Sequence, residues 1–358
     1  MVILKKALVK CICLDRKNMK IILFAFILFT FSAFAQSQIE LDPTPVDSTE
    51  DNDYFIDYSN QLLLKVMTVV KSNNQQITNT NNYQSIKLKP AGTTSLGVGF
   101  NYKWLGLGIA FGLPTSAESD SLYGKTKRFD FQLNIYSKKF VVDAFAQQYK
   151  GMYIENPKKL TAWTAKKFPQ RDSMQTNSVG VAGFYVFNNK KLSYKAAYVR
   201  NAVQKKSAGS FLLGGYYNID YAGFEKGATS FFVPNDFPQE VKDTFAINTY
   251  KSNNYGISFG YTYTFVFKKK WFINLTVLPG VGAQNLIVYN KGIKDVVKEA
   301  ATRVSGRVAV GYENNDLSVG LTSFGTTGSF EYNQYEIEPS TENIRFFIVK
   351  RFNVKKKK

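Results

Sequence analysis

Six charged residues lie where their side chains could act on a bound ligand: Asp130, Asp143, Lys195, Arg303, Arg307 and Arg345. Each lies in a segment where apolar residues alternate with small or polar ones, and each is predicted to share the polar face. If that face lines the inside of a closed sheet, these charges could select an anionic solute or shuttle a ligand. The alternative is a network of ion pairs filling a narrow interior, because buried charges must be paired.

Paired carboxylates are the other chemistry that the sequence could support. Glu118, Asp120, Glu155 and Asp172 could include two that act on a glycosidic bond. All four lie in polar loops, so ordinary solvated charge is the preferred interpretation. We predict no catalytic residue, no cofactor and no metal site.

The residue types that are missing exclude several kinds of active site. The chain has no histidine, which removes Ser-His-Asp and Cys-His catalysis and histidine zinc sites. Its two cysteines, Cys11 and Cys13, precede the predicted mature protein. An enzyme acting on envelope lipid would therefore have to work without a histidine base.

The N-terminal residues have the pattern of a secretory signal peptide. Lys20 precedes an apolar run from Ile21 to Phe29, and Ala33 and Ala35 follow in an A-x-A arrangement, so we predict cleavage after Ala35. Met19 is a better start than Met1. We expect residues 1–35 to be the signal peptide, 36–60 a disordered acidic leader, 61–353 the folded domain and 354–358 a basic tail.

The rest of the chain alternates with the period of a β-strand. In RFDFQLNIY (128–136) the apolar residues fall on one face and Asp130, Gln132 and Asn134 on the other. The segment 255–267 alternates Tyr, Ile and Phe with Gly, Ser and Thr. A water-facing sheet would expose long charged residues, whereas small polar residues suit the crowded inside of a barrel. We therefore predict an all-β, single-domain, antiparallel up-and-down transmembrane barrel whose apolar residues face lipid.

The lengths of the connections agree with this prediction. Short turns, such as 137–139 and 268–270, alternate with long loops, such as 114–127 and 154–175, as in outer-membrane barrels. Aromatic residues flank the short turns and suggest an interfacial girdle: Tyr102, Trp104, Tyr136, Phe140, Phe187, Phe267, Trp271 and Tyr312. The alternation fails once, between Lys191 and Tyr250, where the predicted strands 192–202 and 210–221 are joined by a brief link, so that either one strand is missed near 229–233 or one is over-counted. We predict about 12 strands, with 14 possible.

One long loop, 221–252, stands out because it is apolar and contains prolines. We expect its residues Phe231, Phe232, Pro234 and Phe237 to form a plug that enters the barrel or covers its mouth; the alternative is an ordinary packed loop.

Three stretches resemble the domain-of-unknown-function 4421 family of Gram-negative bacteria: YGISFGYTYTFVFKKKWFINL, SLGVGFNYKWLGLGIAFGLP and QKKSAGSFLLGG. The resemblance extends over about Asp53 to Phe352. It implies an outer-membrane β-barrel, and it implies no reaction and no functional residues.

These observations predict a structural or passive-transport barrel of the cell outer membrane with unknown cargo. A surface receptor that binds through its long loops and an envelope-lipid enzyme remain alternatives. The formal net charge of +19 favours anionic neighbours, and a secreted protein seldom meets nucleic acid. We expect contact with outer-membrane lipid and lipopolysaccharide, and with barrel-assembly machinery during insertion. The sequence predicts no oligomeric state.

Overall fold

The computed structural model describes residues 41–42, 50–103, 105–224, 232–290, 293–314 and 316–354. The predicted signal peptide, the basic tail and Phe231 lie outside the described residues, apart from Val354. The chain divides into two compact units, 1–43 with 354–358 and 44–353. The second unit holds nearly all of the described strands.

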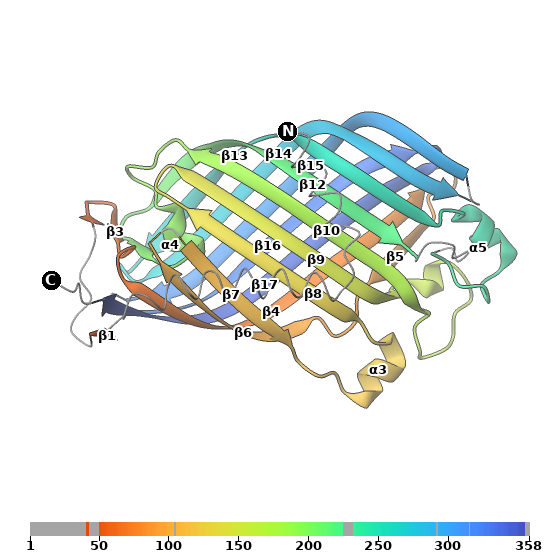
Figure 1. The fold of residues 1–358 in the computed structure, drawn as a ribbon, viewed down its shortest axis with the longest axis horizontal. Helices are drawn as coiled ribbons and strands as arrows, with labels where there is room; N and C mark the ends of the chain where they lie inside the picture. The colour runs from red at the N-terminus through yellow and green to blue at the C-terminus, as the bar shows by residue number, and fades with distance from the viewer. Residues whose placement is uncertain are drawn as a thin grey trace, which may run out of the picture. The chain divides into compact units, whose positions relative to one another are not determined.

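Twelve strands of the described residues form a closed antiparallel ring, because the last strand pairs with the first long one. Figure 1 shows these tilted strands and the crossing sheet behind them. The ring consists of β4 (Leu62–Asn79), β6 (Thr94–Tyr102), β7 (Leu105–Gly112), β8 (Lys127–Tyr136), β9 (Phe140–Ile154), β10 (Gln170–Val186), β12 (Ala208–Gly223), β13 (Thr249–Phe267), β14 (Trp271–Asn290), β15 (Ile293–Glu313), β16 (Leu317–Tyr332) and β17 (Tyr335–Val354). With the short strand β5 (Ser85–Lys89), which also pairs into this sheet, the number of strands falls within the predicted range of 12 to 14.

Alternating burial along the strands separates an inner face from an outer one. Along β13, Tyr255, Ile257 and Phe259 are exposed, whereas Asn254, Ser258 and Thr262 are buried. The outer face carries exposed apolar residues around the ring: Leu64, Val66, Leu96, Val98, Ile109, Phe111, Val181, Phe211, Leu213, Leu275, Val277, Val281, Val304, Leu321, Ile344, Phe346 and Ile348. We call this surface the apolar belt. A closed sheet with an apolar outside and a polar inside is an outer-membrane barrel.

The wall changes its construction beside β4. A short strand, β5 (Ser85–Lys89), pairs with residues 75–78 of β4 and with the last two residues of β9. The longer strand β6 pairs with residues 63–70 of β4. The connection from β7 to β8 carries a short exposed helix, α3 (Ala117–Tyr123). None of the helices among the described residues is long and apolar enough to cross a bilayer.

A folded segment enters the barrel at the end with the short turns. It contains α4 (Tyr194–Tyr198) and β11 (Ala202–Gln204), and β11 pairs with β3 (Phe55–Asp57), which pairs with β2 (Glu50–Asp51). We call residues 188–207 the turn-side plug. The expected strand at 192–202 is therefore wrong: apolar and polar residues of this segment are both buried, Leu192 and Tyr194 as well as Ser193 and Lys195, so their alternation does not separate an inner face from an outer one.

Ion pairs and hydrogen bonds attach the turn-side plug to the wall. The Glu313 carboxylate binds both Arg200 and Arg351, which are buried. Asn101 Nδ2 donates to the Val199 carbonyl over 2.7 Å, and Tyr198 donates its hydroxyl proton to Asn274 Oδ1 over 2.6 Å. The plug is thus bound to several different strands.

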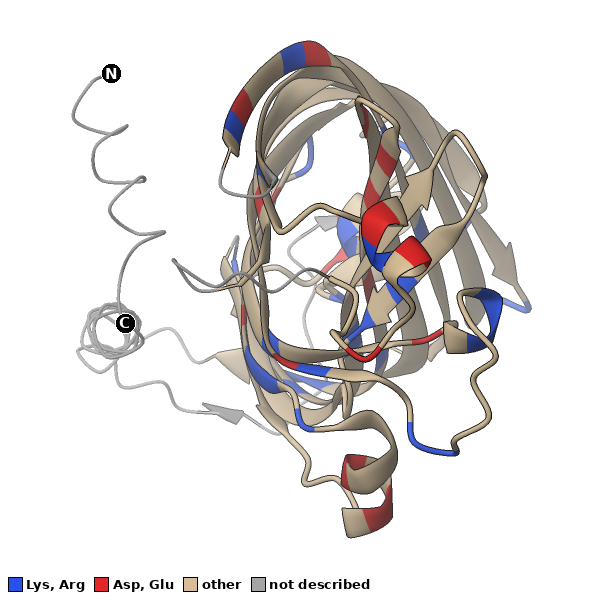
Figure 2. Ribbon diagram, turned by 90° about the vertical axis from the view of Figure 1, so that its right-hand side faces the viewer, with Lys and Arg blue, Asp and Glu red and all other residues tan. Residues whose placement is uncertain are grey.

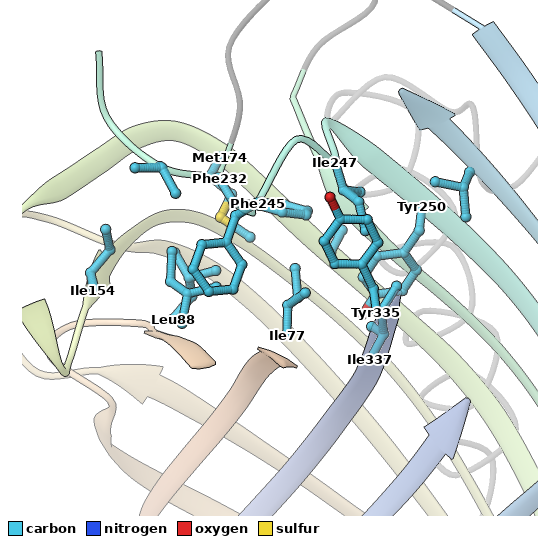
Figure 3. Close-up of a cluster of buried hydrophobic side chains, with 14 of the residues drawn as sticks. Ile77, Leu88, Ile154, Met174, Phe232, Phe245, Ile247, Tyr250, Tyr335 and Ile337 are labelled. Carbon is cyan, nitrogen blue, oxygen red and sulfur yellow. The ribbon is translucent and has the colours of Figure 1, made fainter. Parts of the chain in front are cut away.

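A second plug fills the end with the long loops. We call residues 232–247 the loop-side plug; they include α5 (Gln239–Thr244). Phe232, Phe237 and Phe245 are buried in one apolar cluster with inward residues of nine strands. Figure 3 shows Phe232, Phe245 and Ile247 among Ile77, Leu88, Ile154, Met174, Tyr250, Tyr335 and Ile337 of the wall. Because these partners come from most of the ring, from β9 round to β4, the segment lies inside the barrel mouth.

Two details differ from the sequence expectations. Residues 50–60 fall in the range expected to be disordered, yet Phe55, Asp57 and Tyr58 are buried beside the turn-side plug. Tyr136, expected in an aromatic girdle, is buried on the inner face, because its position shares the parity of Asp130 and Asn134. Phe140, Phe187 and Trp271 are exposed, as a girdle requires.

Candidate functional site

Two adjoining cavities lie inside the barrel and share Lys71, Gln132, Asn134, Tyr198 and Arg345. Tyr198 belongs to the turn-side plug. The cavities offer about 80 Å³ and 40 Å³ to the centres of water-sized molecules, which is room for several waters or for a small polar group. We call them together the lumenal chamber. Figure 2 looks onto the long-loop end of the barrel and shows basic and acidic residues distributed along the strands.

Arg307, Asp143 and Tyr136 form a closed network in the chamber wall. Arg307 Nη2 lies 2.6 Å from Asp143 Oδ2, and Arg307 Nη1 donates to the Tyr136 hydroxyl over 3.0 Å. The Tyr136 hydroxyl donates in turn to Asp143 Oδ1 over 2.7 Å. Here the ion-pair interpretation of the predicted charges holds, because Arg307 and Asp143 neutralise each other.

Arg345 and Arg303 also line the chamber, but neither forms an ion pair with any described carboxylate. Arg345 Nη2 donates to Gln132 Oε1 over 3.0 Å, and its buried Nε has no hydrogen-bond partner among the described residues. Arg303 makes only long hydrogen bonds to Ser305 and Thr326, of 3.4 and 3.5 Å, and its buried Nη1 has no described partner. These two guanidinium groups retain donors for an anion.

Two lysines that the sequence analysis did not single out add to the positive charge. Lys71 lies 3.7 Å from Asp130, which also accepts a hydrogen bond from the Tyr149 hydroxyl over 2.9 Å. Lys65 lines the smaller cavity beside Arg345 and forms no ion pair within the described part of the chain. Among the inward residues that line the chamber, Lys65, Lys71, Arg303, Arg307 and Arg345 thus oppose the two carboxylates of Asp130 and Asp143.

Two further acids lie near the chamber, and Asp220 is the carboxylate that faces Arg303, although the two form no direct ion pair. Asp220 accepts a hydrogen bond from Ser178 over 2.6 Å and lines a smaller cavity with Arg303. Glu342 borders the chamber, but it occupies the strand parity of the exposed residues Ile344 and Phe346.

Of the six charged residues predicted to face the lumen, Lys195 is the one that does not belong to a strand of the barrel wall. It lies on α4, where its Nζ is 2.6 Å from Asp57 Oδ2 and 2.7 Å from Ser59 Oγ. The prediction placed it on a strand facing the lumen, and that strand does not exist. In the structure Lys195 fastens the N-terminal residues to the turn-side plug.

Strand pairing explains how the other charges come together. The β15–β16–β17–β4 register places Arg307, Phe324, Asn343 and Lys71 in one row. Arg345 follows Asn343 by two residues, so it points to the same side. The parity of β4 could have revealed Lys65 and Lys71, but Met67 and Val69 also point inward and pack against Phe347. That small inner cluster hides the alternation.

The four candidate catalytic carboxylates are not brought together. Glu118 and Asp120 lie on α3, Glu155 follows β9 and binds Lys89, and Asp172 is exposed on β10. Residues two apart on a helix do not face each other. Thr115, by hydrogen-bonding the Asp120 carboxyl, and Lys125 hold the pKa of Asp120 below its usual range. The described residues contain no group of three or more acids that could hold a metal ion.

Three solved structures share features of this architecture. The outer membrane protease OmpT from Escherichia coli is 9% identical, with a TM-score of 0.37, and the match covers 85% of this chain and 100% of that one. OmpT of Vibrio cholerae is 10% identical (TM-score 0.31; 85% and 100%). The toluene transporter TodX of Pseudomonas putida is 9% identical (TM-score 0.24; 85% and 90%). At these values the similarity says nothing about the activity of this chain.

No curated protein sequence matches the chain significantly. A family model does match, and it covers residues 49–352, which include every strand of the ring except the last two residues of β17. The chain therefore belongs to the family described as Domain of unknown function (DUF4421).

Proposed function

We propose that this barrel is a passive carrier that binds the anionic group of its cargo in the lumenal chamber. The observation that carries the proposal is the pair Arg303 and Arg345, whose buried N–H groups face the chamber without a carboxylate partner among the described residues. A buried cation without a counter-charge is costly. An anion in the chamber would relieve this cost at both guanidinium groups.

The two plugs support a gated rather than an open route. The loop-side plug packs against the wall through Phe232, Phe237 and Phe245, and the turn-side plug is held by the Glu313 ion pairs. Cargo that enters through the loop end must displace apolar contacts. Apolar contacts can re-form in several arrangements, whereas a buried ion pair needs one geometry. We therefore infer that the loop-side plug moves when cargo passes and that the turn-side plug stays in place.

The structure offers less support for the two alternative functions, an envelope-lipid enzyme and a surface receptor that binds through its long loops. An enzyme would need grouped reactive side chains, whereas the candidate carboxylates are dispersed over exposed segments. A loop-borne receptor would need the apolar part of 221–252 on the surface, whereas Phe232 and Phe237 are enclosed. We therefore propose a non-enzymatic role.

Conductance in planar bilayers tests the proposal. We expect little current through the native barrel and an anion-selective current after residues 225–246 are replaced by a short Gly-Ser turn. In a potassium chloride gradient, the reversal potential should move toward the chloride value. If the deletion prevents folding, Phe232→Ala/Phe237→Ala provides a milder opening.

The matched controls remove equal charge at different places. Arg303→Gln/Arg345→Gln should reduce the anion selectivity of the opened barrel, whereas Lys139→Gln/Lys190→Gln, in exposed turns, should leave it unchanged. Cation selectivity of the opened barrel, or equal effects of the two pairs, would overturn the proposal.

A further inference from the structure

The hydrogen-bond ladder between β7 and β8 is incomplete. Only Leu105, Gly106 and Leu107 pair with β8, opposite Ile135, Asn134 and Leu133. Beyond Leu107, β7 continues to Gly112, and the facing part of β8 extends back to Lys127, but these two stretches do not pair. At about 3.3 Å per residue, roughly 16 Å of the β7 edge is left unpaired. We call this gap between 108–112 and 128–132 the lateral window.

The window lies within the apolar belt. Ile109 and Phe111 of β7 are exposed and pair with Val98 and Leu96 of β6, which are exposed as well. Unpaired backbone groups are costly in hydrocarbon, so they are tolerated only where they are buried in protein or line a water-filled cavity. The smaller cavity of the lumenal chamber is lined by Gly108 and Ala110 of β7 and by Asp130 and Gln132 of β8. The window therefore opens onto the chamber.

Both ends of the window are fixed, which makes it a defined opening. The Leu107–Leu133 pair closes its lower end. At the upper end, the Arg128 guanidinium reaches from β8 to the carbonyls of Gly92 and Thr94. A side chain at Gly112 would collide with Arg128, and one at Gly108 would meet Met67.

The surfaces on the two sides of the window differ in character. The inner face of β7 carries Gly106, Gly108 and Ala110, so no large side chain of this strand blocks the passage. Behind it, Lys65, Lys71 and Arg345 line the same cavity. In front of it, Ile109 and Phe111 face lipid. A molecule that satisfies both sides has an anionic head and one apolar tail.

We propose that the lateral window admits single-chain anionic amphiphiles with a carboxylate head, the head lying at Lys65 and Arg345 and the tail passing between β7 and β8 into the bilayer. This proposal rests on the proposed function, because it uses the same cationic chamber. It names the cargo class and a route through the wall that bypasses both plugs.

Disulfide formation tests the opening itself. Ile109→Cys/Phe131→Cys continues the β7–β8 register, and Val277→Cys/Tyr261→Cys is a matched outward pair at a paired position of the β13–β14 ladder. The second pair should oxidise readily, because facing strand residues meet disulfide geometry. We expect the first pair to remain reduced. Equally fast oxidation of both pairs would overturn the window.

Photo-crosslinking tests the ligand. Palmitic acid with a diazirine in the middle of its chain, added to the protein in nanodiscs, should label residues 109–111 and 129–131 at least fivefold above the β13–β14 wall. The uncharged palmityl alcohol analogue should label both regions equally. A bifunctional reagent that joins the two introduced thiols of Ile109→Cys/Phe131→Cys should abolish the enrichment, whereas joining those of the control pair should not.

The outcomes separate the two proposals. Anion-selective current in the opened barrel without enriched labelling at the window would leave the proposed function standing and sink this inference. Enriched labelling that Lys65→Gln/Arg345→Gln does not reduce would show that the tail enters without the cationic chamber, which also contradicts the inference.

Discussion

Arg307 and Asp143, separated by 164 residues in the chain, meet across the lumen with Nη2 and Oδ2 only 2.6 Å apart. This pair joins β15 to β9, which are not neighbours in the ring. Tyr136 hydrogen-bonds both partners, and Asp143 neutralises Arg307 without a ligand, although Arg307 Nε has no hydrogen-bond partner among the described residues. The charges that remain available are therefore those of Arg303, Arg345 and Lys65.

Asp143→Asn should destabilise the barrel, because it leaves Arg307 buried without a counter-charge. Removing one partner of a buried pair costs about 3–5 kcal/mol of unfolding free energy. Reversible urea unfolding in detergent or liposomes measures this. Asp143→Leu/Arg307→Met should recover most of the loss, since replacing both partners by apolar residues is often neutral. A double variant as unstable as the single one would show that the network acts by another route.

Arg345→Gln should behave in the opposite way. Arg345 forms no ion pair, so its removal leaves no carboxylate buried without a counter-charge. The unfolding free energy of the Arg345→Gln variant should therefore stay within about 1 kcal/mol of the native value or rise. The same urea titration gives the comparison with Asp143→Asn. A loss as large as that of Asp143→Asn would mean that Arg345 is already neutralised, and the anion proposal would lose its basis.

Phe232→Ala should release the loop-side plug while leaving the ring folded. Deleting a fully buried aromatic side chain costs about 3–5 kcal/mol of packing. Trypsin should then cleave after Lys242 at least tenfold faster, with the barrel still resistant to SDS at room temperature. Asn235→Ala, exposed on the same segment, serves as the control. Unchanged cleavage of Phe232→Ala would show that the plug does not depend on this contact.

The loop that joins β7 to β8 should loosen in acid. The pKa of Asp120 is lowered in the folded chain, so its stabilising contribution is present above the unfolded pKa of about 3.9 and is lost as pH falls through the lower folded pKa. Pepsin cleavage between Leu122 and Tyr123, followed from pH 4.5 to 2, measures the onset. Thr115→Val removes the main cause of the shift, so its onset should move to higher pH. An identical onset in both proteins would refute this assignment.

The sequence predicted the wall better than the interior. Strands such as 255–267 were predicted correctly because lipid and lumen impose opposite demands on alternate residues, and this demand is local. Phe232, Pro234 and Phe237 were predicted to enter the barrel or to cover its mouth, with an ordinary packed loop as the alternative, and all three side chains are buried in the structure.

Three features depended on non-local contacts and were missed. Lys195 was assigned to the lumen because a plug enclosed on all sides does not show which face is which. Lys65 was overlooked because inward Met67 and Val69 interrupt the polar face. The lateral window follows from the β7–β8 register, and no alternation pattern in either strand reveals which of its residues lack a partner.

Anomalous diffraction from crystals soaked in sodium bromide tests the central claim most directly, because bromide reports where the lumen holds an anion. The account predicts a bromide peak in the lumenal chamber within hydrogen-bonding distance of Arg345 Nε or Arg303 Nη1, and its disappearance in Arg303→Gln/Arg345→Gln. A chamber without bromide, in crystals whose outer surface has bound it, would contradict the account.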